Sequence, residues 1–143
     1  MSPDALLGTW MLADFTITYS DGRPSLAPLG EGAEGMLLYA ADGHLSAVLS
    51  RAGRSTGSAG LEEGRALVTS QDYVSYTGRW RLEGAFIHHT ILLSLVPEVV
   101  GQTLSRRVDL SDGVLTLTYA RTPRSGVTRR YCLTWRRPDA HPA

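Results

Sequence analysis

The 143-residue sequence is 43% apolar and 20% charged, which is typical of a folded globular domain and not of a disordered chain. Its 14 basic residues, all arginine, balance 14 acidic residues, so no net charge would attract nucleic acid or an anionic membrane. Cys132 is the only cysteine in the sequence, which excludes an intrachain disulfide and a cysteine-based zinc cluster.

Apolar runs of strand length alternate with tight-turn signals along the chain. Asp42-Gly43, Glu83-Gly84 and Asp112-Gly113 belong to the Gly/Asp class that hairpins need for positive φ, and Ser20-Asp21-Gly22 marks a further turn. The pattern predicts eight strands, over Leu7–Tyr19, Met36–Ala40, Leu45–Arg51, Tyr76–Leu82, Phe86–Leu95, Thr103–Leu110, Val114–Arg121 and Thr128–Arg136.

Eight strands joined by hairpins in sequence order favour an up-and-down antiparallel barrel, because closure removes the exposed sheet edges. The prediction is therefore an all-β protein with a single barrel domain over residues 1–143. One short helix is expected at Leu61–Tyr73, between the third and fourth strands. The Gly/Ser-rich piece Arg51–Gly60 before it is predicted to be a mobile loop.

Several short motifs resemble those of the bacterial lipocalin-like domain family of small eight-stranded barrels. Leu6–Trp10 is similar to the family's opening Leu-x-Gly-x-Trp, and Gly35–Ala47 is similar to its second hairpin. Tyr76–Trp80 resembles a Tyr-x-Gly-x-aromatic strand. The pair His88-His89, followed by Ser94-Leu95 and Pro97–Gly101, resembles the family's His-His…Ser-Leu-x-Pro-x-x-x-Gly pattern.

The resemblance runs from Leu6 to about Arg136 and implies the same barrel fold. It also implies a function, because some similar small barrels promote ring closures in natural-product pathways. One departure stands out: the family's span from the histidine pair to the proline is one residue shorter. The extra residue here predicts a β-bulge within Thr90–Val96.

Trp10 begins the first strand and is expected to plug the closed end of the barrel. An arginine near the end of the last strand, Arg136 or Arg137, is predicted to stack on its indole.

Adjacent residues of a strand point to opposite faces, so only one of His88 and His89 can point into the barrel. A three-residue loop, Leu82-Glu83-Gly84, would avoid placing Glu83 at positive φ. In that register Gly78 faces His88 and leaves space for an imidazole. The register predicts that His88 points inward and His89 outward.

Strand register also predicts which residues of the other strands point into the barrel. Asp112-Gly113 as a two-residue turn pairs Leu110 with Leu115 and brings Arg106 opposite Tyr119. If Trp10 points inward and no bulge intervenes, Asp14 also points inward. The predicted site is an aromatic-lined cavity with few polar groups, as small-molecule sites usually are. Its candidate catalytic residues are His88, Arg106 and Tyr76, and its candidate ligand-binding residues are Tyr39, Trp80, Phe86, Tyr119, Tyr131, Trp135 and Asp14.

Two functions fit this predicted cavity. The first is a cofactor-independent cyclase or isomerase, including a pericyclase, that folds an apolar, polyketide-like molecule in secondary metabolism. The alternative is a carrier that binds a small hydrophobic metabolite without reaction. The two histidines point apart with no third ligand spaced to join them, so no metal is expected. No nucleophile elbow, phosphate loop or dinucleotide fingerprint is present in the sequence.

The expected partner is a small hydrophobic ligand or substrate, with neither nucleic acid nor membrane, and a homodimer is left open. The chain shows no signal-peptide pattern and no apolar run near the ~20 residues of a membrane span. We therefore expect a cytoplasmic protein.

Overall fold

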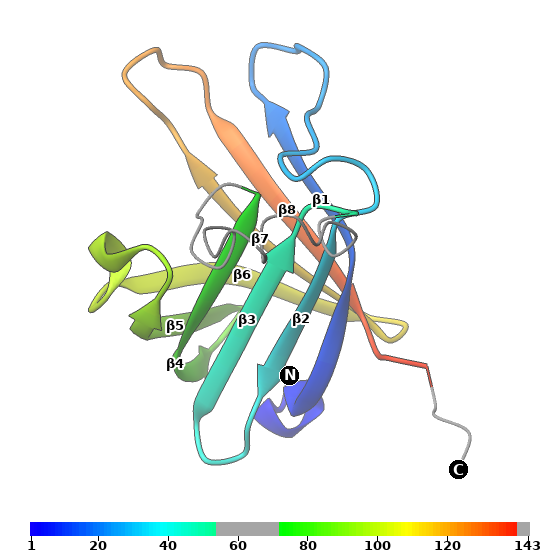
Figure 1. Ribbon diagram of the computed structural model, residues 1–143, viewed down its shortest axis with the longest axis vertical. Helices are drawn as coiled ribbons and strands as arrows, with labels where there is room; N and C mark the ends of the chain where they lie inside the picture. The colour runs from blue at the N-terminus through cyan, green and yellow to red at the C-terminus, as the bar shows by residue number, and fades with distance from the viewer. Residues whose placement is uncertain (54–71, 140–143) are drawn as a thin grey trace, which may run out of the picture.

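The chain folds into a closed barrel of eight strands, each paired with its neighbours in sequence and β8 paired with β1 (Figure 1). The computed structural model describes residues 1–53 and 72–139. The strands are β1 (Gly8–Tyr19), β2 (Glu34–Tyr39), β3 (His44–Ser50), β4 (Tyr73–Glu83), β5 (Phe86–Ser94), β6 (Thr103–Ser111), β7 (Val114–Arg121) and β8 (Arg129–Arg136). All eight pairings are antiparallel. The predicted up-and-down barrel is confirmed.

Two short 3-10 helices, η1 (Pro3–Leu6) and η3 (Pro97–Val99), are the helical elements among the described residues. The helix was predicted for Leu61–Tyr73, and positions 61–71 of it lie outside the described residues. Its last predicted residue, Tyr73, is the first residue of β4. The loop predicted for Arg51–Gly60 lies outside them from position 54 onward. Within the described ranges, no helix is long and apolar enough to cross a membrane.

Trp10 closes one end of the barrel, as predicted. Its side chain is 1% exposed, and its indole N–H donates to the carbonyl oxygen of Leu6 in η1 at 2.9 Å. The guanidinium of Arg137 lies 3.8 Å from the centre of the Trp10 ring system. The same guanidinium donates to the carbonyl oxygens of Ala5 and Thr9, so it ties the N-terminal turn to the end of β8.

The turn between β4 and β5 differs from the predicted one, and the histidines change places as a result. Glu83 pairs with Phe86, so the loop is the two residues Gly84 and Ala85, with Gly84 at φ 59°. Glycine at the first position of a two-residue hairpin loop is the type II′ arrangement, which leaves Glu83 in the strand. The predicted three-residue loop is wrong.

With this register Trp80 pairs with His89 and Arg81 pairs with His88. His89 is therefore the inward histidine, at 2% exposure, while His88 points outward and contacts Glu83 and Ser105. The prediction that His88 faces the interior is wrong, because a shift of one residue exchanges the two faces of a strand. Phe86 moves with His88 and is 45% exposed, so its expected place in the cavity is wrong too.

The predicted bulge in β5 is present at Leu92. Thr77 pairs with Leu93 and Gly78 pairs with Ile91, which leaves Leu92 as an extra residue on β5. A Cβ on Gly78 would lie 1.9 Å from the carbonyl oxygen of Thr90, so the backbones approach each other where a side chain cannot fit. Gly78 therefore accommodates the bulge, and does not leave space for an imidazole as expected.

A second bulge, in β1, determines the position of Asp14. Leu12 pairs with Trp135 and Asp14 pairs with Thr134, so Ala13 is the extra residue. The alternation of inward and outward side chains that begins with the buried Trp10 shifts by one residue at Ala13. Asp14 is exposed and Phe15 faces the cavity, so the condition attached to an inward Asp14 is not met.

Candidate ligand-binding site

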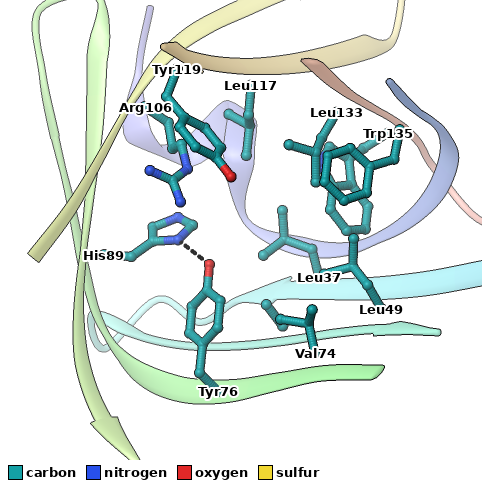
Figure 2. Close-up of a pocket in the computed structure, with 12 residues that line it drawn as sticks. Leu37, Leu49, Val74, Tyr76, His89, Arg106, Leu117, Tyr119, Leu133 and Trp135 are labelled. Carbon is teal, nitrogen blue, oxygen red and sulfur yellow. Dashed lines mark hydrogen bonds between the residues drawn. The ribbon is translucent and has the colours of Figure 1, made fainter. Parts of the chain in front are cut away.

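The barrel interior contains a cavity of about 100 Å³. Figure 2 shows its polar side chains, from His89, Tyr76, Arg106 and Tyr119, on one side, and apolar side chains on the other. The apolar lining comes from Phe15, Leu37, Ala47, Leu49, Val74, Leu117, Leu133 and Trp135. A mostly apolar wall with a few grouped polar atoms is typical of a site for a small organic molecule.

His89 in β5 is held between two tyrosines from other strands. Its Nε2 lies 2.7 Å from the hydroxyl of Tyr39, which ends β2 and is 1% exposed. Its Nδ1 lies 2.8 Å from the hydroxyl of Tyr76 in β4 (Figure 2). Since β3 and β4 separate β2 from β5 in the sheet, the Tyr39–His89 hydrogen bond crosses the barrel interior.

Burial determines the protonation of this group. It lowers the pKa of His89 from 6.5 to about 3, with a further contribution from the nearby charge of Arg106. Burial also raises the pKa of Tyr76 to about 12 and the pKa of Tyr39 well above its ordinary value. At neutral pH the imidazole is therefore neutral and both phenols keep their protons.

Arg106 in β6 brings a positive charge to the cavity. Its guanidinium carbon lies 3.6 Å from the ring centre of Tyr119 in β7, and the guanidinium donates to the backbone oxygen of Ser105 at 3.3 Å. The rings of Tyr119 and Tyr131, paired across β7 and β8, stack with centres 4.5 Å apart. Arg106, Tyr119 and Tyr131 thus form a continuous stack over three neighbouring strands.

The structure brings together part of the predicted site. Arg106, Tyr76, Tyr119 and Trp135 line the cavity, and Tyr131 supports it through the stack with Tyr119. Tyr39 contacts the site through His89. Trp80 lies behind Tyr39 with ring centres 4.8 Å apart, and its indole N–H donates to the carbonyl oxygen of Ala40. His88, Phe86 and Asp14 lie outside the cavity.

Sequence reasoning missed His89 and Phe15 as interior residues. Each lies next to the residue that was predicted to point inward, His88 or Asp14. Each error is therefore a shift of one residue in strand register. The signal that would have found His89 is the dipeptide Gly84-Ala85, because glycine followed by any residue fits a type II′ loop. The sequence gives no comparable signal for the bulge at Ala13.

Trp135, which lines the cavity, carries a hydrogen-bond donor without an acceptor. The indole N–H of Trp135 is buried and has no partner in the described part of the chain. Within residues 1–53 and 72–139, no three His, Cys, Asp or Glu side chains are grouped as metal ligands.

Comparison with known families agrees with this architecture. Residues 7–138 match the family described as a lipocalin-like domain, a range that covers all eight strands. No curated protein matches the chain. A lipocalin-like barrel suggests small-molecule binding, which accords with the apolar cavity. The chain belongs to the lipocalin-like domain family.

Proposed function

We propose that the barrel binds a small, mainly apolar molecule through one polar group. The observation that carries this proposal is the grouping of Tyr76, His89 and Arg106 on one wall of an otherwise apolar cavity. Apolar walls favour a ligand body that leaves water, while a few fixed polar groups select its orientation.

The size of the cavity limits what lies inside it. At about 100 Å³ it is smaller than the ~300–1,000 Å³ of sites that enclose drug-sized ligands. A short molecule, or the polar end of a longer one, fits this volume. Val74 lines the cavity and is 38% exposed, so we propose that the remainder of a longer ligand leaves the barrel beside it.

Native mass spectrometry of the freshly purified protein tests this function. The expected result is an adduct of near-stoichiometric occupancy that denaturation releases as a mainly apolar compound. Protein that remains empty, and that binds no member of a series of small apolar compounds in a titration, contradicts the proposal.

A second candidate function is cofactor-independent catalysis, as a cyclase or isomerase acting on an apolar, polyketide-like substrate in secondary metabolism. It is favoured by the position of Tyr76 and Arg106, whose hydrogen-bond donors face one cavity beside the neutral His89. Such donors stabilise a carbonyl oxygen that gains negative charge during a ring closure, and one donor contributes about 3–4 kcal/mol in known cases. Holding a flexible chain in a reactive conformation contributes about 7–11 kcal/mol in favourable intramolecular reactions.

The same cluster argues against an isomerase that removes a proton with His89. An imidazole with a pKa of about 3 is a weak base at neutral pH, and general bases work best when their pKa is near the operating pH. Ring closure by preorganisation needs no base. Within the catalytic candidate we therefore favour the cyclase, with Tyr76 and Arg106 as donors and His89 as the residue that positions Tyr76.

Catalyst and carrier differ in what becomes of the ligand. Linear polyene or polyketide-like precursors are incubated with the protein and analysed by liquid chromatography with mass spectrometry. A cyclase gives a product of unchanged mass and altered retention, and the Arg106→Met variant gives less of it. A precursor that is bound and recovered unchanged identifies the carrier.

A further inference from the structure

We propose that the ligand of this cavity is an organic acid, whose carboxylate pairs with Arg106 and accepts a second hydrogen bond from Tyr76. This inference rests on the proposed binding function and names the chemical class of the ligand.

The positive charge of Arg106 is unbalanced. A guanidinium is charged at all ordinary pH values and has five N–H donors. Within the described residues it has no carboxylate within ion-pair distance, and its guanidinium contacts the Tyr119 ring and the backbone oxygen of Ser105. Charged groups that lose water are normally paired, and the described part of the chain supplies no counter-ion to Arg106, so a ligand can supply one.

The groups around Arg106 do not neutralise it. Tyr39, Tyr76 and Tyr119 interact with its charge, but burial raises the pKa of all three phenols, so they remain uncharged at neutral pH. His89 is neutral as well, and Arg121 adds a second positive charge nearby. Burial lowers the pKa of Arg106 itself, which reflects the cost of an unpaired cation at this position. An anionic ligand group removes that cost.

The tautomer of His89 decides the direction of the Tyr76 hydroxyl hydrogen. A neutral imidazole donates from one nitrogen and accepts at the other. Among the described residues, His89 Nε2 is the hydrogen-bond partner of the buried Tyr39 hydroxyl. If Nε2 carried the proton, Tyr39 would have to accept it, and the Tyr39 hydroxyl hydrogen would be buried without an acceptor, which is costly.

Tyr39 therefore donates to Nε2, and the proton lies on Nδ1, which donates to the Tyr76 oxygen. Within residues 1–53 and 72–139 the Tyr76 hydroxyl hydrogen then has no acceptor, and Tyr76 lines the cavity. The chain Tyr39–His89–Tyr76 thus delivers an O–H donor to the cavity that also contains the guanidinium of Arg106 (Figure 2). A carboxylate, with two acceptor oxygens, satisfies both donors.

The test compares head groups on identical apolar chains. Straight-chain carboxylic acids of four to ten carbons, and the primary alcohols of the same lengths, are titrated into the native protein at pH 7 by isothermal calorimetry. We expect the acid to bind about 10- to 100-fold more tightly than the alcohol of equal length, as charge-assisted hydrogen bonds imply.

Two variants and a matched control test which side chains cause the preference for acids. Arg106→Met is expected to reduce acid affinity to that of the alcohol, with alcohol affinity changed by less than about threefold. Arg107→Met, which removes the same charge from the neighbouring exposed position of β6, is the matched control and keeps the preference. Tyr76→Phe is expected to weaken acids several-fold and alcohols less, and circular dichroism checks the fold of each variant.

The outcomes separate this inference from the function beneath it. Equal binding of acids and alcohols by the native protein overturns the organic-acid inference and leaves the binding function standing. A preference for acids that survives in Arg106→Met also overturns the inference. If neither series binds and the freshly purified protein is also empty, the proposed binding function fails and this inference fails with it. If neither series binds but the purified protein releases an apolar compound without an acid group, only the organic-acid inference is overturned.

Discussion

Tyr39 in β2 reaches across the barrel to His89 in β5, with its hydroxyl oxygen 2.7 Å from Nε2 of the imidazole. The two residues are 1% and 2% exposed, so water cannot replace either partner. This hydrogen bond ties strands that do not pair with each other, and it fixes the proton of His89 on Nδ1. Under the proposed function, stability and ligand binding share this one polar contact inside an apolar core.

Removing the Tyr39 hydroxyl leaves a buried imidazole nitrogen without its partner. We predict that Tyr39→Phe lowers the free energy of unfolding by about 1–3 kcal/mol, the cost of an unsatisfied buried polar group. Tyr131→Phe is the control, since its hydroxyl has no hydrogen bond in the described part of the chain, and a change within about 0.5 kcal/mol is expected there. Urea denaturation measures both, and equal costs for the two variants would contradict the prediction.

The low pKa of His89 predicts a specific dependence of stability on pH. The unfolded imidazole takes up a proton near pH 6.5, whereas the folded one does so only near its pKa of about 3. The unfolded state thus binds more protons in this window, and the native protein loses stability as the pH falls, by about 1.4 kcal/mol per pH unit. The His89 contribution is complete above pH 6.5 and is lost toward pH 3.

His89→Gln removes that titration and keeps one donor and one acceptor. The variant is expected to be less stable than the native protein at pH 7, and the gap should narrow by roughly 2–3 kcal/mol at pH 4.5. Other titrating groups are common to both proteins and cancel in the difference. Denaturation curves at the two pH values measure the difference in unfolding free energy between the two proteins. A difference that does not change with pH would contradict a neutral, buried His89.

The bulge at Leu92 predicts that Gly78 cannot be replaced. An alanine Cβ would lie 1.9 Å from the Thr90 carbonyl oxygen, and both atoms are fixed by the backbone. We predict that Gly78→Ala costs more than about 3 kcal/mol or prevents folding. Gly126→Ala is the comparison: it has positive φ but open space around it, so only the strain of about 1–2 kcal/mol applies. Similar costs at the two positions would show that the β4–β5 register is wrong.

The closed end of the barrel depends on the contact between Arg137 and Trp10. Arg137→Ala removes a cation–π contact and two hydrogen bonds to backbone oxygens, and we predict a loss of about 1–2 kcal/mol in stability. Arg136→Ala, at the exposed neighbouring position, should change stability by less than about 0.5 kcal/mol. Thermal unfolding distinguishes the two arginines, and a larger effect at Arg136 would contradict this contact.

The barrel could be predicted from the sequence because its signals are local and repeated. Apolar runs of strand length, separated by Gly-containing turns, predict strands that pair antiparallel with their neighbours in sequence. Eight such strands in order leave few alternatives to a closed barrel. The β6–β7 hairpin was correct to the residue, with Leu110 opposite Leu115, because Asp112-Gly113 allows one short loop. The bulge within Thr90–Val96 was predicted from a single extra residue.

The inward faces could be predicted only where register was fixed. At the β4–β5 turn the loop that forms is Gly84-Ala85 and not the predicted Leu82-Glu83-Gly84, so the inward histidine is His89 and not His88. In β1 no glycine or proline marks the bulge at Ala13 in the sequence. Asp14 was therefore predicted to point inward, where Phe15 lies instead. In both cases an error of one residue exchanged the two faces of a strand.

The proposed ligand lies inside the barrel, against the wall formed by Tyr76, His89 and Arg106. Ala47 lines the cavity and pairs with Tyr76, so Ala47→Leu fills a large part of the space. Ala120→Leu adds the same carbons at an exposed position of β7 and is the control. The measurement is calorimetric titration of both folded variants with the compound that the native protein binds most tightly. We predict at least a tenfold loss of affinity for Ala47→Leu and none for Ala120→Leu. Native affinity in Ala47→Leu would instead place the ligand outside this cavity.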